Sequence, residues 1–468
     1  MFVVTFTFND LLEFMYHSNP NSIALRLCLT LVVILSTLYI VKPSRKVFLL
    51  DFACYKPKDT QASTNERVLK QIGKYGKFTE ESMDFMKKMM GKSGLGQSTY
   101  LPDALLKECP NPCMKEAREE AEEVMFGAID ELLRKTRVKS EDIGILVVNC
   151  SIFNVVPSLS AMIVARYKLG ENVRSYNLGG MGCSAGLMAI GLAKQLLLVH
   201  HNCYALVVST ENISQNCYIG NNPPMLFANC LFRVGGAAIL LSNRPSDRRS
   251  SKYQLIHTVH TNTASSDRSY HCIYQEEDLD GQEGLNVTKD LMDVAIRAIA
   301  SNITTLGRLV LPVSEQLRFL ANYLIRYFHV AKIEPYIPKF KNAFDHFFPH
   351  VGGKPVLDGL QRNLGFSEAE MEASRMTLYR FGNTSSSSVW YQLAYSEAKG
   401  RIKRGNLVWQ LAFGSGFKCT SAVWRALRTV DHEEGNPWRD EIHQFPVDLR
   451  NIGSDLAYFE PVQKDIAG

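Results

Sequence analysis

The chain has 468 residues, of which 46% are hydrophobic and 21% are charged, and its formal net charge is +5. With a mean hydropathy of -0.09, this composition is typical of a globular protein large enough for two or three domain-sized units. It excludes a disordered chain, a collagen-like repeat and a polytopic membrane protein, each of which needs a more biased composition. The weak, dispersed positive charge suits anionic ligands or a membrane surface and does not indicate nucleic-acid binding.

Residues 23–41 (IALRLCLTLVVILSTLYIV) form one strongly apolar run, about as long as a helix that crosses a ~30 Å hydrocarbon core. Acidic residues precede the run and basic residues follow it, which is the reverse of a signal peptide. We therefore expect a transmembrane helix at residues 23–41, with the following chain in the cytosol. The N-terminal segment, residues 1–22, leaves open whether there are one or two membrane segments. Sequons at Asn212 and Asn302 should then stay unglycosylated.

After a polar region at residues 56–98, helical and strand patterns alternate. Apolar residues recur at three- and four-residue intervals over residues 114–137, which predicts a helix. Residues 143–149 follow as a short, buried strand rich in Ile, Leu and Val. Such alternation indicates an α/β fold with largely buried sheets.

One order of elements occurs twice: strand, small-residue turn, helix, strand and closing strand. We interpret this repeat as two similar halves. The first copy comprises a strand at 173–177, the turn LGGMGCSAG, a helix at 187–199, a strand at 204–209 and the run from Phe232. The second comprises a strand at 377–381, the turn GNTSSSS, a helix at 389–399, a strand at 407–413 and the run from Phe417.

The 11 cysteines are odd in number and lack a repeating spacing, so we expect reduced thiols in a reducing compartment. Among them, Cys183 lies where a strand gives way to a helix. The helix dipole and free N–H groups there favour thiolate, the nucleophilic form, and could stabilise a thioester oxyanion. Two alternatives stay open: Cys183 is a small core residue, or residues 180–185 form a dinucleotide fingerprint with Glu211 as ribose ligand.

A nucleophilic cysteine needs a base or an electrostatic partner. His350 shortly precedes two glycines, as expected for a histidine on a tight loop before a helix. For His346, the alternative to a role in the site is that of a hydrogen-bonded structural histidine. The spacing of the two histidines mimics a helical metal pair, but Pro349 would break a helix there, and we expect no metal. Asn383 begins the second turn, in the place that mirrors Cys183, although asparagine is also a good helix cap. Residues 414–416 end a strand. Their backbone N–H groups could bind an oxyanion, or the glycines could simply form a hairpin turn.

These residues lie in motifs that resemble the plant-type 3-ketoacyl-CoA synthases, membrane-bound condensing enzymes of very-long-chain fatty acid elongation. The resemblance spans nearly the whole chain and is carried by long motifs. They are DFACYKP at 51–57, NLGGMGCSAG at 177–186, CLFRVGGAAILLSNR at 230–244, SRMTLYRFGNTSSSSVWYQLAY at 374–395 and AFGSGFKC at 412–419.

The resemblance implies a thiolase-like, layered αβαβα fold of two similar halves. We expect these at residues 42–335 and 336–430, followed by a tail at 431–468. It also implies a catalytic triad on Cys183, His350 and Asn383, with an oxyanion site from the backbone of Cys183, Gly414 and Gly416. Acyl-CoA and malonyl-CoA would be condensed to 3-ketoacyl-CoA with loss of CO₂, without any further cofactor.

The sequence departs from the family pattern at Phe348, Pro349 and Val351, and at the supporting positions Asn262 and Tyr379; His346 is a third supporting position. These departures leave a weakly active scaffold subunit of an elongase as one alternative. A type III polyketide synthase, which shares the triad, is another. The resemblance further implies the endoplasmic reticulum membrane with the catalytic part cytosolic, a homodimer, and the reductases and dehydratase of elongation as partners.

Overall fold

A computed structural model of the chain describes residues 27–32, 45–75, 78–108, 113–329, 333–334, 336, 340–430 and 433–449. It contains two compact units, residues 1–45 and residues 46–468. Within the first, residues 27–32 are helical and exposed. The rest of the predicted membrane segment, the residues before it and most of the tail lie outside the described residues.

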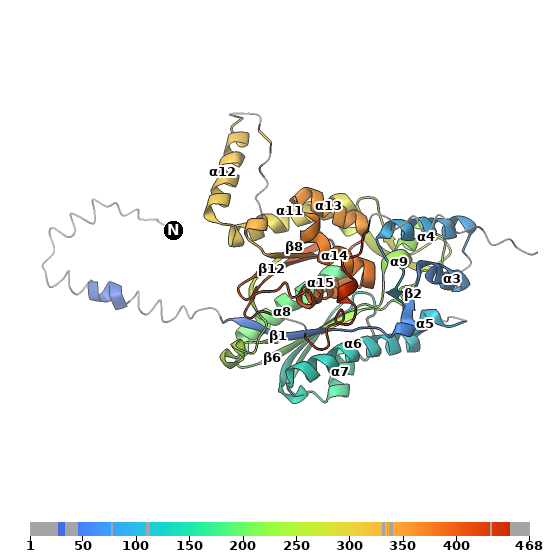
Figure 1. Cartoon of the computed structure of the whole chain (residues 1–468), viewed down its shortest axis with the longest axis horizontal. Coiled ribbons are helices and arrows are strands. Elements are labelled where there is room, and N and C mark those ends of the chain that lie inside the picture. Colours follow the sequence, from blue (N-terminus) through green and yellow to red (C-terminus); the bar gives the residue numbers. More distant parts are fainter. Residues whose placement is uncertain are drawn as a thin grey trace, which may run out of the picture. The chain divides into compact units, whose positions relative to one another are not determined.

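The second unit is built on one mixed sheet of nine strands, in the order β11-β12-β13-β8-β1-β7-β6-β4-β5. Figure 1 labels β1, β6, β8 and β12 of this sheet. The strands of the first half are β1 (Val47–Cys54), β4 (Ile143–Asn149), β5 (Arg174–Leu178), β6 (Tyr204–Thr210) and β7 (Gly236–Ser242). Those of the second half are β8 (Tyr253–Asn262), β11 (His346–Pro349), β12 (Leu407–Gly414) and β13 (Lys418–Ala426).

The two halves of the sheet share one pairing pattern. β4 runs parallel to β6, and β6, β7 and β1 then alternate in direction. In the same way, β11 runs parallel to β12, and β12, β13 and β8 alternate. β1 pairs with both β7 and β8, so it joins the halves. The predicted duplication is thus confirmed in the sheet. β8, which belongs to the second half of the sheet, lies before residue 335 in the chain, and the boundary at that residue stays a prediction.

Helices cover the sheet in layers. α6 (Met114–Thr136) packs on β1, β6 and β7, and α11 (Leu291–Val310) packs on β8 and β13. Between them, α8 (Ala185–Val199) contacts β4 and β6 of the first half and also β12 and β13 of the second. α15 (Ser388–Ala398) contacts β1, β11 and β12, and each of its residues is buried. The low polarity of α8 and the complete burial of α15 follow from this central position.

The remaining elements surround these layers. The helices are α3 (Asn65–Tyr75), α4 (Glu80–Ser93), α5 (Asp103–Leu106), α7 (Leu159–Tyr167), α9 (Pro223–Leu231), α10 (Asp267–Tyr270), α12 (Val313–Tyr327), α13 (Lys354–Leu364) and α14 (Glu368–Phe381). The short strands are β2 (Ala62–Ser63), β3 (Thr99–Tyr100), β9 (Ile273–Glu277) and β10 (Glu283–Val287).

The predicted helix over 114–137 and the strands over 143–149, 204–209 and 407–413 are confirmed by α6, β4, β6 and β12. The strand predicted over 377–381 is wrong, because these residues end α14. A capping box opens this helix: Ser367 and Glu370 each bind the other's backbone N–H. The strand was expected because a strand precedes the small-residue turn in the first copy of the repeat, whereas a helix precedes it in the second.

One further apolar helix could be mistaken for a membrane span. Within the described residues, 182–199 are the only helical stretch that is long and apolar enough to cross a membrane. They comprise α8 and the turn before it, and half of this stretch is buried inside the protein. We therefore read these residues as a core helix.

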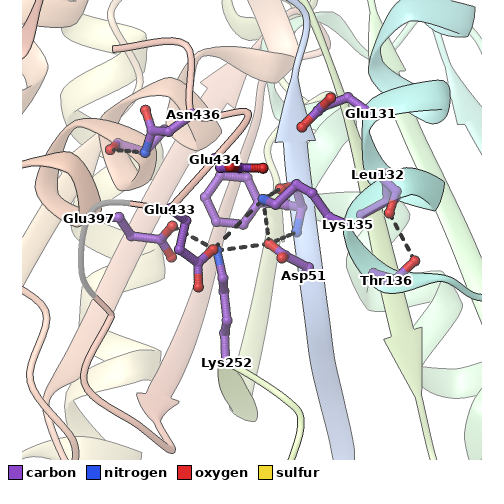
Figure 2. A network of polar contacts seen from close by, with 12 residues as sticks. Asp51, Glu131, Leu132, Lys135, Thr136, Lys252, Glu397, Glu433, Glu434 and Asn436 are labelled. Atoms are coloured by element: carbon purple, nitrogen blue, oxygen red, sulfur yellow. Dashed lines mark hydrogen bonds and ion pairs between the residues drawn. The ribbon is translucent and has the colours of Figure 1, made fainter. Parts of the chain in front are cut away.

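A buried cluster of charges connects β1 with the C-terminal part of the chain (Figure 2). The ammonium of Lys252 is fully buried and pairs with Asp51 at 2.8 Å, with Glu397 at 2.9 Å and with Glu433. Lys135 of α6 also pairs with Asp51, at 2.9 Å. Burial alone would lower the pKa of Lys252, but the three carboxylates raise it, so its charge is retained.

Candidate active site

Cys183 lies in a single 3-10 turn, Gly182–Ser184, directly before α8. The loop between β12 and β13 crosses against this turn, backbone to backbone. A Cβ on Gly182, which has φ +58°, would lie 2.5 Å from the Ser415 nitrogen, and one on Gly414 would lie 2.5 Å from the Cys183 nitrogen. Only glycine fits at both positions, which explains the small residues in each turn.

His350 follows β11 and comes before α13, as the sequence predicts. Its N–H donates to the Leu411 carbonyl at 2.7 Å, which fixes the backbone to β12. Its Nδ1 lies 2.8 Å from the Ser388 hydroxyl, so Nε2 is the ring nitrogen left for a ligand. Burial lowers the pKa of His350 to about 3, and the imidazole is neutral near pH 7.

Asn383 is held between α9 and α15. Its N–H donates to the Leu231 carbonyl, and its own carbonyl accepts from the Arg233 N–H at 3.0 Å. The side-chain Oδ1 accepts from the Ser385 N–H at 2.9 Å. Because Oδ1 is occupied in this way, the Nδ2 donor is the part of the amide that can serve a ligand.

These three residues, from three separate segments, line one cavity of about 560 Å³. The backbone at Gly414, Ser415 and Gly416 lines it too. Beyond them the walls are mainly apolar, from α9, the β9–β10 hairpin, α11 and α13. Residues of these walls include Phe227, Leu231, Ile273, Leu285, Leu291, Met292, Ala295 and Val356. A polar end with an apolar extension suits a ligand that combines a reactive carbonyl with a long hydrocarbon chain.

The predicted thiolate is wrong for the resting state. Cys183 lines the cavity, and loss of water around its thiol raises the pKa to about 12. A hydrogen bond from Ser385 lowers that pKa and the charge of Glu211 raises it, but burial has the larger effect. The helix terminus does not offset the loss of water, so the resting form is the thiol.

Two residues beside the thiol were not identified as partners from the sequence. The Ser385 hydroxyl lies 3.5 Å from the Cys183 sulfur and 3.2 Å from the Glu211 carboxylate. Ser385 has a φ of +54°, a left-handed conformation unusual for a residue with a side chain. The turn containing it was visible in the sequence, but nothing there distinguished this serine from its neighbours.

Glu211 was considered only as a ribose ligand, and its surroundings differ from that role. Its carboxylate accepts the backbone N–H groups of Ser151 and Ile152 and lies 3.2 Å from the Cys150 sulfur. Burial raises its pKa. Since the carboxylate is engaged by protein donors beside the thiol, the dinucleotide alternative is not supported. Nor is Cys183 a core filler, because it lines the cavity.

The mirror position of Cys183 is also corrected. The second turn is a 3-10 turn over Ser385–Ser387 before α15, just as Gly182–Ser184 precedes α8. Ser385 and Gly182 both have positive φ. The counterpart of Cys183 is therefore Ser386, and Asn383 lies three residues earlier.

The supporting positions predicted from the resemblance do not join the cavity. His346 starts β11, at the opposite end of that strand from His350, with its Nε2 3.3 Å from the Asn406 side chain. Tyr379 of α14 packs on Phe445. Asn262 ends β8, where its Oδ1 accepts from the Ala264 N–H.

The departures from the family pattern also lie outside the cavity lining. Phe348 and Val351 are buried, and the Pro349 carbonyl accepts from the Gln392 amide at 2.7 Å. Together with Asn262 and Tyr379, these changes leave the residues around the thiol intact. Within the described residues, no group of side chains is arranged to hold a metal ion.

Comparison with protein families gives two matches that together span most of the chain. Residues 39–328 match the family described as FAE1/Type III polyketide synthase-like protein. Residues 341–426 match the C-terminal part of 3-oxoacyl-[acyl-carrier-protein] synthase III.

Among curated proteins, the chain is 60% identical to 3-ketoacyl-CoA synthase 2 of Arabidopsis thaliana over 452 residues, which cover 95% of this chain and 84% of that protein. It is 56% identical to 3-ketoacyl-CoA synthase 11 of the same plant, over 97% of this chain and 89% of the relative. A probable 3-ketoacyl-CoA synthase 20 of Oryza sativa is 52% identical, over 92% of this chain and 84% of the relative.

Solved structures show the same fold at low identity. A type III pentaketide synthase from Neurospora crassa superposes with a TM-score of 0.64 at 18% identity, over 81% of this chain and 99% of that one. A fungal type III polyketide synthase gives 0.63 at 17% identity, with the same coverage. The chain thus has the thiolase-like α/β fold of these enzymes.

Proposed function

Since the chain belongs to the 3-ketoacyl-CoA synthase family, we propose that Cys183, His350 and Asn383 carry out its reaction. The enzyme condenses a long or very long acyl-CoA with malonyl-CoA and releases 3-oxoacyl-CoA, CO₂ and CoA, the first step of very-long-chain fatty acid elongation. The observation that carries the assignment of residues is their convergence on one cavity with an apolar extension.

In the first half-reaction, the Cys183 sulfur attacks the thioester carbonyl of the acyl-CoA. The resting thiol must lose its proton as it attacks, because its pKa is about 12. The neutral His350 accepts that proton and returns it to the departing CoA thiolate, so no net charge is left in the buried site. The backbone N–H groups at Cys183, Gly414 and Gly416 stabilise the oxyanion, and the acyl chain occupies the apolar part of the cavity.

In the second half-reaction, malonyl-CoA places its thioester carbonyl between His350 and Asn383. Loss of CO₂ leaves the electron pair on the α-carbon, and the enolate oxygen accepts hydrogen bonds from the two side chains. For this step His350 carries its proton on Nε2, and Nδ1 accepts from the Ser388 hydroxyl. Both groups are then neutral donors in an enclosed site, where such hydrogen bonds are strong. The carbanion attacks the Cys183 thioester, and the thiolate that leaves takes up a proton from water, the one proton that the overall reaction consumes. Decarboxylation generates the carbanion, so the reaction needs no cofactor besides the CoA thioesters.

Replacement of Cys183 by Ala tests this assignment. We expect formation of 3-ketoacyl-CoA from labelled malonyl-CoA to fall by more than about a thousandfold, since no acyl-enzyme can form. Mass spectrometry should then find no acyl adduct on the protein. Cys203→Ala is the matched control, because this cysteine lies at the start of β6 and outside the cavity. Turnover of the Cys183→Ala variant at the rate of the control would disprove the role of this residue.

We also propose that the enzyme lies at the cytosolic face of the endoplasmic reticulum membrane and that residues 23–41 anchor it there. The basic residues that follow the apolar run support this orientation. Asn212 and Asn302 cannot report on it, because both are buried. Asn286 can report on the orientation, because it belongs to a sequon, lies on β10 and is only half-buried. We expect Asn286 to stay unglycosylated. In sealed microsomes, we expect added protease to digest the catalytic unit. A glycan on Asn286 would show that the orientation is the opposite one.

The proposal includes a homodimer that works with the reductases and the dehydratase of elongation. An exposed sheet edge supports the dimer. β5 ends the sheet, and most of its residues are exposed.

A further inference from the structure

α12 projects from the second unit, beyond the end of α11 (Figure 1). It spans Val313–Tyr327 and follows α11 after Leu311 and Pro312. Glu315 is its one buried residue, and nearly all the others are exposed. A helix that packed on the protein would bury one side, so this helix is not part of the core.

The polar side of α12 contacts the segment that follows the helix, at Glu334 and Tyr336. Glu315 accepts from the Tyr336 hydroxyl at 2.6 Å and from Arg318 at 3.2 Å. Asn322 accepts from the Tyr336 N–H at 3.0 Å and donates to the Glu334 carbonyl at 3.0 Å. The chain that returns from the helix is thus held against its hydrophilic side.

The apolar side of α12 faces outward. Its large apolar residues recur at alternating intervals of four and three, which places them on one face of a helix. Their exposed fractions run from 40% to 69%, and two aromatic residues extend the face. The face consists of Val313, Leu317, Leu320, Leu324 and Tyr327, with Tyr323 beside them and Phe328 after the helix. Phe319 and Ile325 are exposed too, outside this face, with exposed fractions of 40% and 36%.

In a water-soluble protein the orientation would be reversed, with apolar residues inward and polar residues outward. A helix that hides its polar side and exposes its apolar side is arranged for an apolar environment. Two kinds of environment could provide it: a lipid bilayer or a protein surface.

The charges on α12 favour the bilayer. Within residues 313–329 the only acidic residue is Glu315, which is buried, whereas Arg318, Arg326 and His329 are exposed. No carboxylate of the described residues pairs with Arg326. Arg326 lies on the polar side of the helix, opposite the apolar face, as in helices that lie in a membrane interface. Exposed cations on such a side complement anionic lipid headgroups, and tyrosines suit the boundary between headgroups and acyl chains. The substrate of the enzyme, a long-chain acyl-CoA, is itself an amphiphile.

We propose that α12 is a second, interfacial membrane contact, independent of the segment at residues 23–41. The helix lies in the plane of the bilayer, with Leu317, Leu320 and Leu324 among the acyl chains and Arg326 at the headgroups. At ~1.5 Å per residue, its 15 residues extend about 22 Å, so it is too short to span the ~30 Å hydrocarbon core.

Tryptophan reporters in the full-length chain, reconstituted in vesicles, test this contact. The four native tryptophans, at 390, 409, 424 and 438, are fully buried, so they give a constant background. Leu320→Trp and Leu324→Trp each place an indole on the apolar face. Leu279→Trp is the control, since Leu279 is fully exposed at the tip of the β9–β10 hairpin. Retained condensing activity shows that each variant is folded.

With lipids brominated on the acyl chain, we expect Leu320→Trp and Leu324→Trp to lose about half of the introduced emission, and Leu279→Trp to lose none. Replacing part of the neutral lipid by anionic lipid should increase the quenching, and the further change Arg326→Gln should reduce that increase. Absence of quenching at both helix positions would overturn the proposal. So would emission at these positions that depends on protein concentration and not on brominated lipid, since a second copy would then cover the face.

Discussion

The Ser385 hydroxyl has one proton and two acceptors, the Cys183 sulfur at 3.5 Å and the Glu211 carboxylate at 3.2 Å. The hydrogen bond to sulfur lowers the pKa of Cys183, whereas the negative charge of Glu211 raises it. The two neighbours therefore act on the same thiol in opposite directions. A change at either neighbour should therefore change the reactivity of Cys183.

We predict that Ser385→Ala slows and Glu211→Gln accelerates the alkylation of Cys183 by iodoacetamide at a fixed pH between 8 and 9 (roughly tenfold in thiolate for each pKa unit). The sign follows from the pKa: removal of the stabilising hydrogen bond raises it, and removal of the neighbouring negative charge lowers it. Site-resolved mass spectrometry measures the rate, with the exposed Cys113 as internal reference. Shifts in the same direction for both variants would contradict this account.

The charge of Lys252 is fully buried, and carboxylates surround it. Burial alone would raise the pKa of Asp51, but Lys252 and Lys135 lower it below its ordinary value. Asp51 thus contributes stability above its unfolded pKa, and the contribution is lost as pH falls through its folded value. The cluster also ties Glu433 of the C-terminal chain to β1 through Lys252 (Figure 2).

We predict that Lys252→Met lowers the free energy of unfolding by about 3–5 kcal/mol, since Asp51 and Glu397 would remain buried without their main partner. Chemical denaturation of the detergent-solubilised chain measures the change. Lys139→Met is the control, because Lys139 pairs with Glu141 on the exposed surface and should matter little. Equal midpoints for the two variants would show that the buried cluster does not stabilise the fold.

At the scale of elements, α11 separates the substrate cavity from solvent. Leu291, Met292 and Ala295 of this helix line the cavity, whereas Ile296 is 46% exposed and does not line it. Ala295 is the smallest of these lining side chains. The length of acyl chain that fits should therefore depend on this position.

We predict that Ala295→Phe lowers the rate with the longest acyl-CoA substrates by roughly tenfold or more, because the ring occupies space needed by the distal part of the chain. Shorter substrates should be affected less, so the products shift towards shorter 3-ketoacyl-CoA. A series of acyl-CoA lengths measures the shift. Ile296→Phe, at an exposed position of the same helix that does not line the cavity, should leave the length profile unchanged. An unchanged profile in Ala295→Phe would exclude α11 as a wall of the acyl site.

The elements that could be predicted from the sequence are those with a strong period or a distinctive turn. α6, β4 and β6 follow from local patterns of apolar residues, and the two turns before α8 and α15 follow from their small residues. The end of α14 was predicted as a strand by analogy with the first copy of the repeat, in which a strand precedes the small-residue turn. The capping box that marks this segment as a helix begins ten residues before Thr377.

The site could be predicted only in part, for a related reason. Cys183, His350 and Asn383 lie in motifs that the sequence displays, and the fold brings them to one cavity. The partnership of Ser385 with Glu211 joins residues 174 positions apart, and no local pattern reports it. The resting thiol was also missed, because burial is a property of the folded molecule and exceeds the effect of the helix terminus at this site.

At the scale of the whole molecule, the two edges of the sheet differ. β11 ends the sheet on one side, and most of this short strand is buried. β5 ends it on the other side, where Arg174, Ser175, Tyr176 and Asn177 are exposed. An exposed strand edge has unpaired backbone groups that can extend the sheet into another chain. In a two-fold dimer each β5 would meet its own copy in antiparallel direction.

This geometry gives a prediction for the dimer. In a symmetric pairing of Arg174–Leu178 with its copy, the central residue Tyr176 lies next to the axis and meets the same residue of the second chain. Tyr176→Glu would then place two carboxylates opposite each other across the axis. The dissociation constant of the dimer should rise by more than about tenfold, since like charges at an interface cost on the order of a few kcal/mol. Sedimentation of the full chain in detergent should show a dimer for the unmodified protein and for Tyr176→Phe, which keeps the ring. A monomeric unmodified protein would exclude the dimer, whereas a Tyr176→Glu variant that stays dimeric would place the contact away from β5.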